Sequence, residues 1–100
     1  MPVRIDAKNA KLSDSTKEHV DKACAKFSQF YDRIVDTEVI IDTQAGKHLS
    51  TAEIIVKVPN QRIVGKGEAD DTNLFKAIDE AASHVGRQLK KYHDKQAEHR

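Results

Sequence analysis

Apolar and charged residues alternate at the start of the chain, where Val3, Ile5 and Ala7 are separated by Arg4 and Asp6. A repeat of two residues is typical of a strand with one buried face. We therefore expect a first strand over residues 3–8.

Three later segments are rich in β-branched residues and are separated only by short turns. The segments are 34–44, 51–58 and 61–69. Ala45-Gly46-Lys47 and Pro59-Asn60 have the composition of turns. The pattern predicts three strands joined as an antiparallel meander.

Two other segments repeat apolar residues every three or four positions, which is the period of a helix. The first follows Ser13-Asp14-Ser15-Thr16, a run of N-cap residues, and Glu18 would complete a capping box with Ser15. Its apolar stripe is Val20, Ala23, Cys24, Phe27, Phe30 and Tyr31.

The second helix is expected from Asp70 onward, with Asp70, Asp71 or Thr72 as its cap. Its inward stripe is Leu74, Ala77, Ile78, Ala81, Val85, Leu89 and Tyr92. The last residues, 94–100, are too polar for the final strand that a ferredoxin-like fold would need.

This order of elements predicts an α+β fold, β-α-β-β-β-α, with a four-stranded sheet and two helices packed on one face. One hundred residues suit a single domain, 1–100. No apolar run approaches the roughly 18 residues of a membrane span, and no signal-peptide core follows the first residues. The single cysteine, Cys24, can form no internal disulfide, and we expect a cytoplasmic protein with no membrane partner.

The net charge of +1, from 17 Lys and Arg against 16 Asp and Glu, argues on its face against a protein that binds a polyanion. The charges are unevenly distributed, however. Residues 68–80 carry five acids and one lysine, a net −4, whereas residues 84–100 carry five bases and two acids, a net +3. Acids at the start and bases at the end of a helix each gain roughly 0.3–1 kcal/mol from the helix dipole, which explains part of this pattern.

Two basic ridges are expected to frame a groove between the helices. Lys22 and Lys26 lie one turn apart on the first helix. On the second helix, the rotation of about 100° per residue places four basic side chains on one flank, namely His84, Arg87, Lys91 and Lys95. Such a groove would suit an RNA backbone, but a solvated helix face is the commoner explanation of exposed charge, and the residues alone leave both open.

Other chemistries find little support in the sequence. Gly65-Lys66-Gly67 lacks the spacing of a phosphate-binding loop and fits an edge or bulged strand. The histidines lack metal-ligand spacing, Cys24 fits a buried hydrophobe, and no serine has the context of a nucleophile. We therefore expect no enzyme, no metal, no cofactor and no small-molecule substrate.

Three segments resemble the ribosome hibernation promoting factors. They are the end of the first predicted helix, Lys26–Ile34, the start of the second, Asp71–Asp79, and its basic continuation, Arg87–Lys95. Each motif is short, but they occur in the family's order and on the corresponding elements, and the resemblance spans nearly the whole chain.

The resemblance implies a fold similar to double-stranded-RNA-binding domains and a short-form protein. Such a protein would lodge between the head and body of the small ribosomal subunit, block the paths of messenger and transfer RNA, and stop translation reversibly during stress or stationary phase. Its partners would be ribosomal RNA and proteins of that subunit, and a separate ribosome modulation factor would be needed for ribosomes to pair. The implied RNA-binding residues are Lys22, Lys26, Arg87, Lys90, Lys91 and Lys95, with His84 at a position where lysine is expected.

Some positions depart from the family pattern. Gly86 replaces a helix former, at a cost of about 1 kcal/mol relative to alanine. His84 and His93 replace lysines, which is expected to make RNA affinity more sensitive to pH. The alternative functions are a generic double-stranded-RNA-binding domain and a protein-interaction module that uses Ile40, Ile55 and Val64 on the open face of the sheet.

Overall fold

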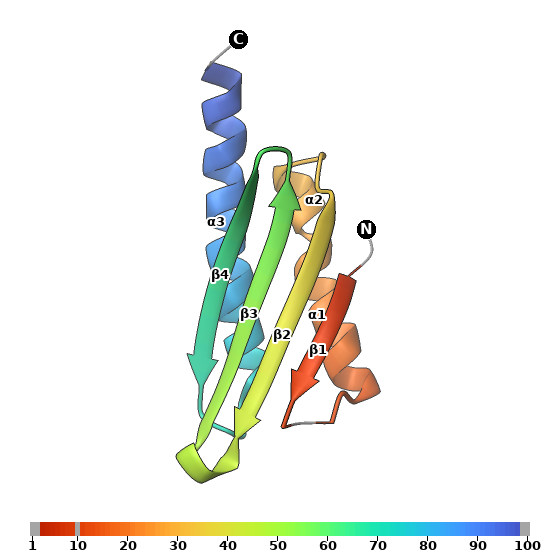
Figure 1. The fold of residues 1–100 in the computed structure, drawn as a ribbon, viewed down its shortest axis with the longest axis vertical. Coiled ribbons are helices and arrows are strands. Elements are labelled where there is room, and N and C mark those ends of the chain that lie inside the picture. Colours follow the sequence, from red (N-terminus) through yellow and green to blue (C-terminus); the bar gives the residue numbers. More distant parts are fainter. Residues whose placement is uncertain (1–2, 10, 99–100) are drawn as a thin grey trace.

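Four strands, three α-helices and one 3-10 turn make up the computed structural model, which describes residues 3–9 and 11–98 (Figure 1). The elements are β1 (Val3–Lys8), α1 (Asp14–Ala25), α2 (Phe27–Phe30), β2 (Asp36–Gln44), the 3-10 turn η1 (Ala45–Lys47), β3 (Leu49–Val58), β4 (Gln61–Ala69) and α3 (Leu74–Glu98). This is the predicted order, and the predicted α+β class is confirmed. Arg100, one of the bases counted in the final segment, lies outside the described residues.

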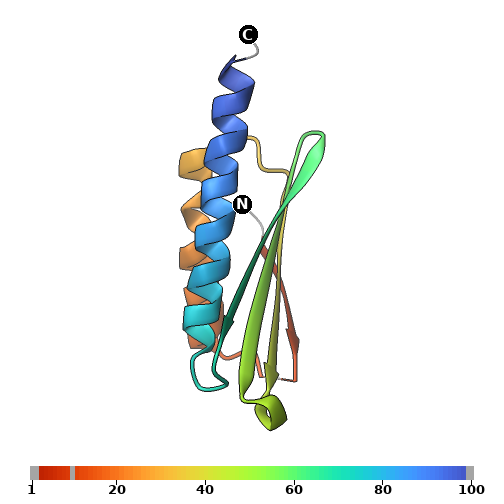
Figure 2. The ribbon, with the colours of Figure 1, turned by 90° about the vertical axis from the view of Figure 1, so that its left-hand side faces the viewer.

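The strands form one sheet in the order β1-β2-β3-β4, in which β1 pairs with β2 in parallel and the other pairs are antiparallel. The parallel pair follows from the connection between β1 and β2, because that connection passes through α1 and α2. The helices α1, α2 and α3 pack on one face of the sheet, and within residues 3–9 and 11–98 no element covers the other face (Figure 2).

The first helix is capped by Ser13, whose side chain accepts a hydrogen bond from the Thr16 amide at 3.1 Å. The capping box that was expected from Ser15 and Glu18 is therefore wrong, because Ser13 has the extended backbone of an N-cap and the helix begins one residue later. The single predicted helix is also split at Lys26 into α1 and α2, although Lys26 keeps helical backbone angles.

The second predicted helix is α3, and it begins at Leu74, later than a cap at residues 70–72 requires. The Asp70 carboxylate accepts hydrogen bonds from the Thr72 amide at 3.0 Å and the Thr72 hydroxyl at 2.6 Å. These bonds hold a turn, and the carbonyl of Asn73 accepts the first bonds of the helix, from Lys76 and Ala77. A local side-chain bond has thus delayed the helix by competing with helical geometry.

The boundaries of two strands also differ from the prediction by two residues. β2 begins at Asp36 instead of Ile34, and β3 begins at Leu49 instead of Thr51. The hairpin between them is tighter than expected because η1 is followed by His48 in a left-handed conformation, with φ of 51°. That turn lets Leu49 pair directly with Gln44.

The core lies between the sheet and the helices, and both predicted helical stripes contribute to it. Its fully buried side chains include Val20, Cys24, Phe27, Val39, Ile41, Ile54, Val56, Ala77, Ile78, Ala81, Val85 and Leu89. No helix in the described ranges is long and apolar enough to cross a membrane.

The long helix α3 rests directly on the edge strand β4. A Cβ atom on Gly65 would meet the carbonyl oxygen of Ala81, and one on Gly67 would meet that of Ala77. Glycine is needed at both positions because helix backbone occupies the space of a side chain. The interpretation of this segment as a glycine-bearing edge strand is confirmed.

Candidate functional site

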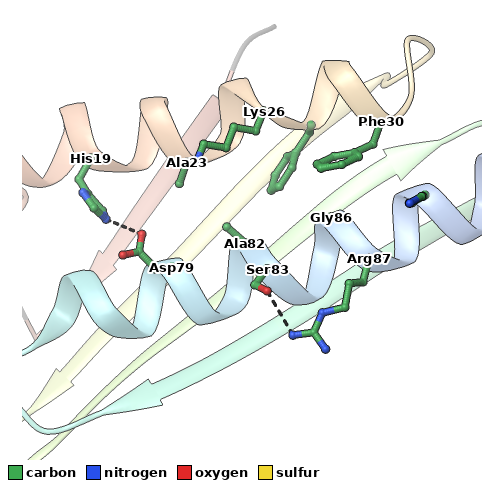
Figure 3. Close-up of a pocket in the computed structure, with 11 residues that line it drawn as sticks. His19, Ala23, Lys26, Phe30, Asp79, Ala82, Ser83, Gly86 and Arg87 are labelled. Atoms are coloured by element: carbon green, nitrogen blue, oxygen red, sulfur yellow. Dashed lines mark hydrogen bonds and ion pairs between the residues drawn. The ribbon is translucent and has the colours of Figure 1, made fainter.

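A groove of about 590 Å³ runs between α1 and α2 on one side and α3 on the other (Figure 3). It is open to solvent and reaches down to the core residue Phe27. The residues that line it are His19, Ala23, Lys26, Phe27, Phe30, Asp79, Ala82, Ser83, Gly86, Arg87 and Lys90.

Three predicted site residues form a basic rim on this groove, namely Lys26, Arg87 and Lys90. Lys26 lies at the junction of α1 and α2. Arg87 and Lys90 lie three residues apart on α3, across the groove from Lys26. The Arg87 guanidinium donates a hydrogen bond to the Ser83 hydroxyl at 3.2 Å, which holds the cation beside the groove (Figure 3). All three side chains are exposed and available to an anion.

The opposite end of the groove is closed by a contact between the helices. His19 on α1 lies 2.7 Å from the Asp79 carboxylate on α3, and its ring stacks on Phe75 with a centroid separation of 4.2 Å. Figure 3 shows this pair at one end and Phe30, Lys26 and Arg87 towards the other. The groove is therefore polarised, with a carboxylate at one end and cations at the other.

The floor between these ends is apolar. Phe30 lies over Gly86, where an added Cβ atom would come within 3.3 Å of the ring. Ala23 on α1 and Ala82 on α3 also line the groove, and their small apolar side chains leave space between the helices. Gly86, which departs from the family pattern, thus lets Phe30 approach the backbone of α3.

The remaining basic residues of α3 face a different surface. Lys91 and Lys95 line a depression of about 390 Å³ on the β4 side of the helix, together with Arg62 from β4. The expectation that one basic ridge borders the groove is wrong for these two residues, because α3 presents one flank to α1 and the opposite flank to β4. The sequence did not identify Arg62 as a member of this basic surface, because Lys91 and Lys95 lie about 30 positions away along the chain. The available signal was its outward position in a predicted strand.

His84 also lies on the β4 flank, and it is not on the groove. Its Nδ1 donates to the carbonyl of Lys66 at 2.8 Å, and Gln88 donates to that of Val64 at 2.7 Å. The Tyr92 hydroxyl donates to the carbonyl of Pro59 at 2.6 Å. These side chains, spaced four residues apart, satisfy two carbonyl groups of the edge strand β4 and one in the turn that precedes it.

Lys22 belongs to neither surface. Its side chain is exposed on α1 and lies 3.4 Å from the Glu18 carboxylate one turn away. Such an exposed pair contributes little to stability, so Lys22 remains accessible to a partner.

The cysteine and the possible metal ligands lie in surroundings that do not favour reactivity or metal binding. Burial raises the pKa of the Cys24 thiol to about 12, with a further contribution from the Asp21 carboxylate, so the thiol is a poor nucleophile. In the part of the chain that the structure describes, three or more His, Cys, Asp or Glu side chains nowhere gather as a metal site would require.

The open face of the sheet carries a small apolar patch. Ile55 and Val64 are direct cross-strand neighbours, and Ile40 is diagonal to Ile55. Charged side chains flank the patch, among them Glu53 and Lys66, whose charged groups lie 3.5 Å apart. A role of this face in protein interactions stays a prediction.

Comparison with known proteins identifies relatives along nearly the whole chain. The chain is 29% identical over 99 residues to the ribosome hibernation promoting factor of Escherichia coli K12, covering 99% of this chain and all of that protein. It is 27% identical over 96 residues to the protein of the same name from Pseudomonas putida KT2440, covering 96% and 90%. A ribosome hibernation promotion factor of Bacillus subtilis is 23% identical, and the match covers 95% of this chain and 50% of that protein.

Solved structures show the same fold. The N-terminal domain of Thermus thermophilus Protein Y superposes with a TM-score of 0.79 at 25% identity, covering 89% of this chain and 94% of that one. A ribosomal subunit interface protein from Coxiella burnetii superposes with a TM-score of 0.83 at 21% identity, covering 94% and 99%. The family model for the sigma 54 modulation protein / S30EA ribosomal protein matches residues 3–97. The resemblance noted in the sequence is thereby confirmed, and the chain belongs to the sigma 54 modulation protein / S30EA ribosomal protein family.

Proposed function

We propose that this protein is a ribosome hibernation factor that binds the small ribosomal subunit in the channel for messenger and transfer RNA and reversibly blocks translation. The observation that carries the proposal is the match, over nearly the full length of both chains, to proteins named ribosome hibernation promoting factor. Residues 1–100 act in this proposal as one ribosome-binding domain of the cytoplasm, active during stress or stationary phase.

The chemistry of the helix surface supports ribosomal RNA as the ligand. The groove carries Lys26, Arg87 and Lys90, and the β4 flank carries Lys91, Lys95 and Arg62. The second half of α3 therefore presents cations on both of its flanks. Contacts from several cations to phosphate groups supply affinity with little reading of base sequence.

The shape of the molecule suits inhibition by occlusion. The protein is elongated, with extents of 50 × 22 × 18 Å, and α3 runs along its length (Figure 1). A rod of this size, held in a channel by its basic half, excludes other RNA strands without any bond being made or broken. Dissociation then restores an intact ribosome.

Co-sedimentation with purified small subunits tests the proposal through three triple variants of equal charge change. The groove variant is Lys26→Glu, Arg87→Glu and Lys90→Glu, and the flank variant is Arg62→Glu, Lys91→Glu and Lys95→Glu. The control is Lys8→Glu, Lys11→Glu and Lys47→Glu, at exposed positions near the far end of the molecule. We expect the groove and flank variants to lose binding and the control to keep it.

Circular dichroism checks that each variant keeps its fold. Binding by the groove and flank variants at the level of the unchanged protein would overturn the placement of the site. No inhibition of translation by a protein that does bind the subunit would overturn occlusion. Sucrose gradients with and without a ribosome modulation factor would show whether pairing of ribosomes requires that second protein, as proposed.

A further inference from the structure

We propose that the groove between α1, α2 and α3 holds an unpaired nucleotide of an RNA strand, with its base against Phe30 and its phosphates at Lys26, Arg87 and Lys90. This inference rests on the proposed function, because it specifies the form of RNA that the groove accepts. It distinguishes the groove from the β4 flank, where the aromatic ring that lines the depression, Tyr92, packs edge-on against Tyr31.

The floor of the groove provides the surface that a base requires. Phe30 lines the groove and keeps 37% of its surface exposed, although its neighbour Phe27 is buried. An aromatic ring left exposed between two helices is available for stacking on a base, and such stacking tolerates any base sequence. The groove volume of about 590 Å³ lies within the range of pockets for small organic ligands, so one nucleotide fits.

An RNA duplex cannot use this floor. Its bases are stacked inside the helix, and proteins contact it mainly through phosphate and 2′-hydroxyl groups. Phe30 lines the groove and packs against the backbone of α3 at Gly86, so only a base that is free of its own stack can lie on the exposed part of the ring (Figure 3).

The charges along the groove determine where the RNA strand crosses it. Lys26, Arg87 and Lys90 stand at the end near Phe30, whereas Asp79 occupies the opposite end, held by its contact with His19. A phosphate is attracted to the first end and repelled from the second. The strand therefore crosses the groove at the basic end and inserts one base, instead of following the groove along its whole length.

Nuclear magnetic resonance of the amide-labelled protein tests the inference with an unstructured octaribonucleotide and with the same strand in a duplex, at one salt concentration. We expect the amide signals of Ala82 and Gly86 to shift with the single strand and not with the duplex. Phe30→Leu keeps apolar volume but removes the π-face, and it should weaken binding of the single strand about tenfold.

Phe75→Leu is the matched control, since Phe75 is a ring of α3 with 39% of its surface exposed that stacks on His19 at the acidic end of the groove, away from the basic end where the base is placed. It should change the affinity for the single strand less than twofold. Equal shifts of Gly86 with duplex and single strand would overturn the inference, as would a larger loss of affinity in Phe75→Leu than in Phe30→Leu.

The two proposals fail in different ways. In one outcome, the groove charge variant loses binding to small subunits, but the amide signal of Gly86 does not shift when the single strand is added. That outcome would refute the nucleotide site and leave the proposal of ribosome binding standing. In the opposite outcome, the Gly86 signal shifts with the single strand but the protein does not bind small subunits. That outcome would refute the proposed ribosome binding and leave the nucleotide site standing. Thermal melting of Phe30→Leu verifies that the fold persists.

Discussion

Gly86 shows how one residue trades helix stability for the shape of a surface. Glycine inside a helix costs about 1 kcal/mol relative to alanine, yet at this position it lets the Phe30 ring lie against α3. Because Phe30 is partly exposed, its ring has room to move by a few tenths of an ångström. The two effects can therefore be separated by adding one methyl group.

We expect Gly86→Ala to raise the free energy of unfolding by somewhat less than about 1 kcal/mol, since the gain in helix propensity exceeds the crowding of a movable ring. The same change should narrow the groove and weaken the binding of single-stranded RNA. Urea unfolding and RNA titration of the same variant measure the two effects. A lower urea midpoint would mean that Phe30 is held rigidly.

Cys24 is expected to be inert while the protein is folded. The side chain is fully buried, and its pKa of about 12 keeps the thiol protonated throughout the neutral range. A thiol reagent such as dithionitrobenzoate at pH 8 should label the native protein slowly and the guanidinium-unfolded protein at once. Rapid labelling of one thiol per native chain would contradict this burial.

The same pKa predicts a loss of stability at high pH. The unfolded thiol ionises near its ordinary pKa of about 8.5, whereas the native thiol keeps its proton until about pH 12. The contribution of Cys24 to stability is therefore fully present below about pH 8.5 and is lost as the pH rises towards 12. Unfolding free energies from pH 8 to 10.5 should fall more steeply for the unchanged protein than for Cys24→Ala, and parallel curves would argue against the shift.

The sequence was sufficient to place most buried residues, although Phe30 of the predicted apolar stripe is 37% exposed, and it was insufficient to place several polar ones. The alternation of Val3, Ile5 and Ala7 and the stripe of α3 depend on burial, which repeats with the period of the element. The choice between Ser13 and Ser15 as the helix cap depends on backbone angles that no pattern reports. His84 illustrates the same limit, because its partner, the carbonyl of Lys66, is 18 residues away.

Among the elements, α3 has the closest packing, since its backbone lies on that of β4. The absence of a side chain at Gly65 and Gly67 permits this approach, and the side chains of His84 and Gln88 then reach carbonyl groups of the strand, while Tyr92 reaches the turn before it. The sequence predicted the helix and its buried stripe correctly. It could not show which flank would meet α1 and which would meet β4, so the basic residues were assigned to one ridge.

We expect Gly67→Ala to destabilise the protein by about 1–3 kcal/mol or more, because the new methyl group would meet the backbone of α3 at Ala77 and Ala81. Backbone atoms cannot move aside as a side chain can, so the helix must lift from the sheet. Urea unfolding measures the loss.

Gly46→Ala provides the control for this comparison. A Cβ atom at Gly46, in the turn between β2 and β3, meets nothing within 4 Å. Its effect on the unfolding free energy should stay within about 0.5 kcal/mol. Equal effects at Gly46 and Gly67 would contradict the close approach of α3 to β4.

The molecule as a whole carries a net charge of only +1, and its distribution matters more than its sum. Acids gather at the start of α3, and bases gather on both flanks of its second half. A polyanion close to the surface experiences the nearby cations more strongly than the distant acids, since salt screens charges beyond about 8–10 Å. RNA should therefore approach one end of the molecule and be repelled from the other.

The salt dependence of RNA binding distinguishes local charge from net charge. Each contact between a cation of the protein and a phosphate contributes about 0.7 to the slope of log K against log salt for single-stranded RNA, so the slope becomes shallower by this amount when one contact is lost. The double variant Arg87→Gln and Lys90→Gln should thus lower the affinity and make the slope shallower by about 1.4. The double variant Lys11→Gln and Lys47→Gln changes the net charge equally, from +1 to −1, at exposed positions outside the groove. It should leave the slope unchanged, because counterions are released only where a cation contacts a phosphate, and equal changes in both variants would mean that net charge governs binding.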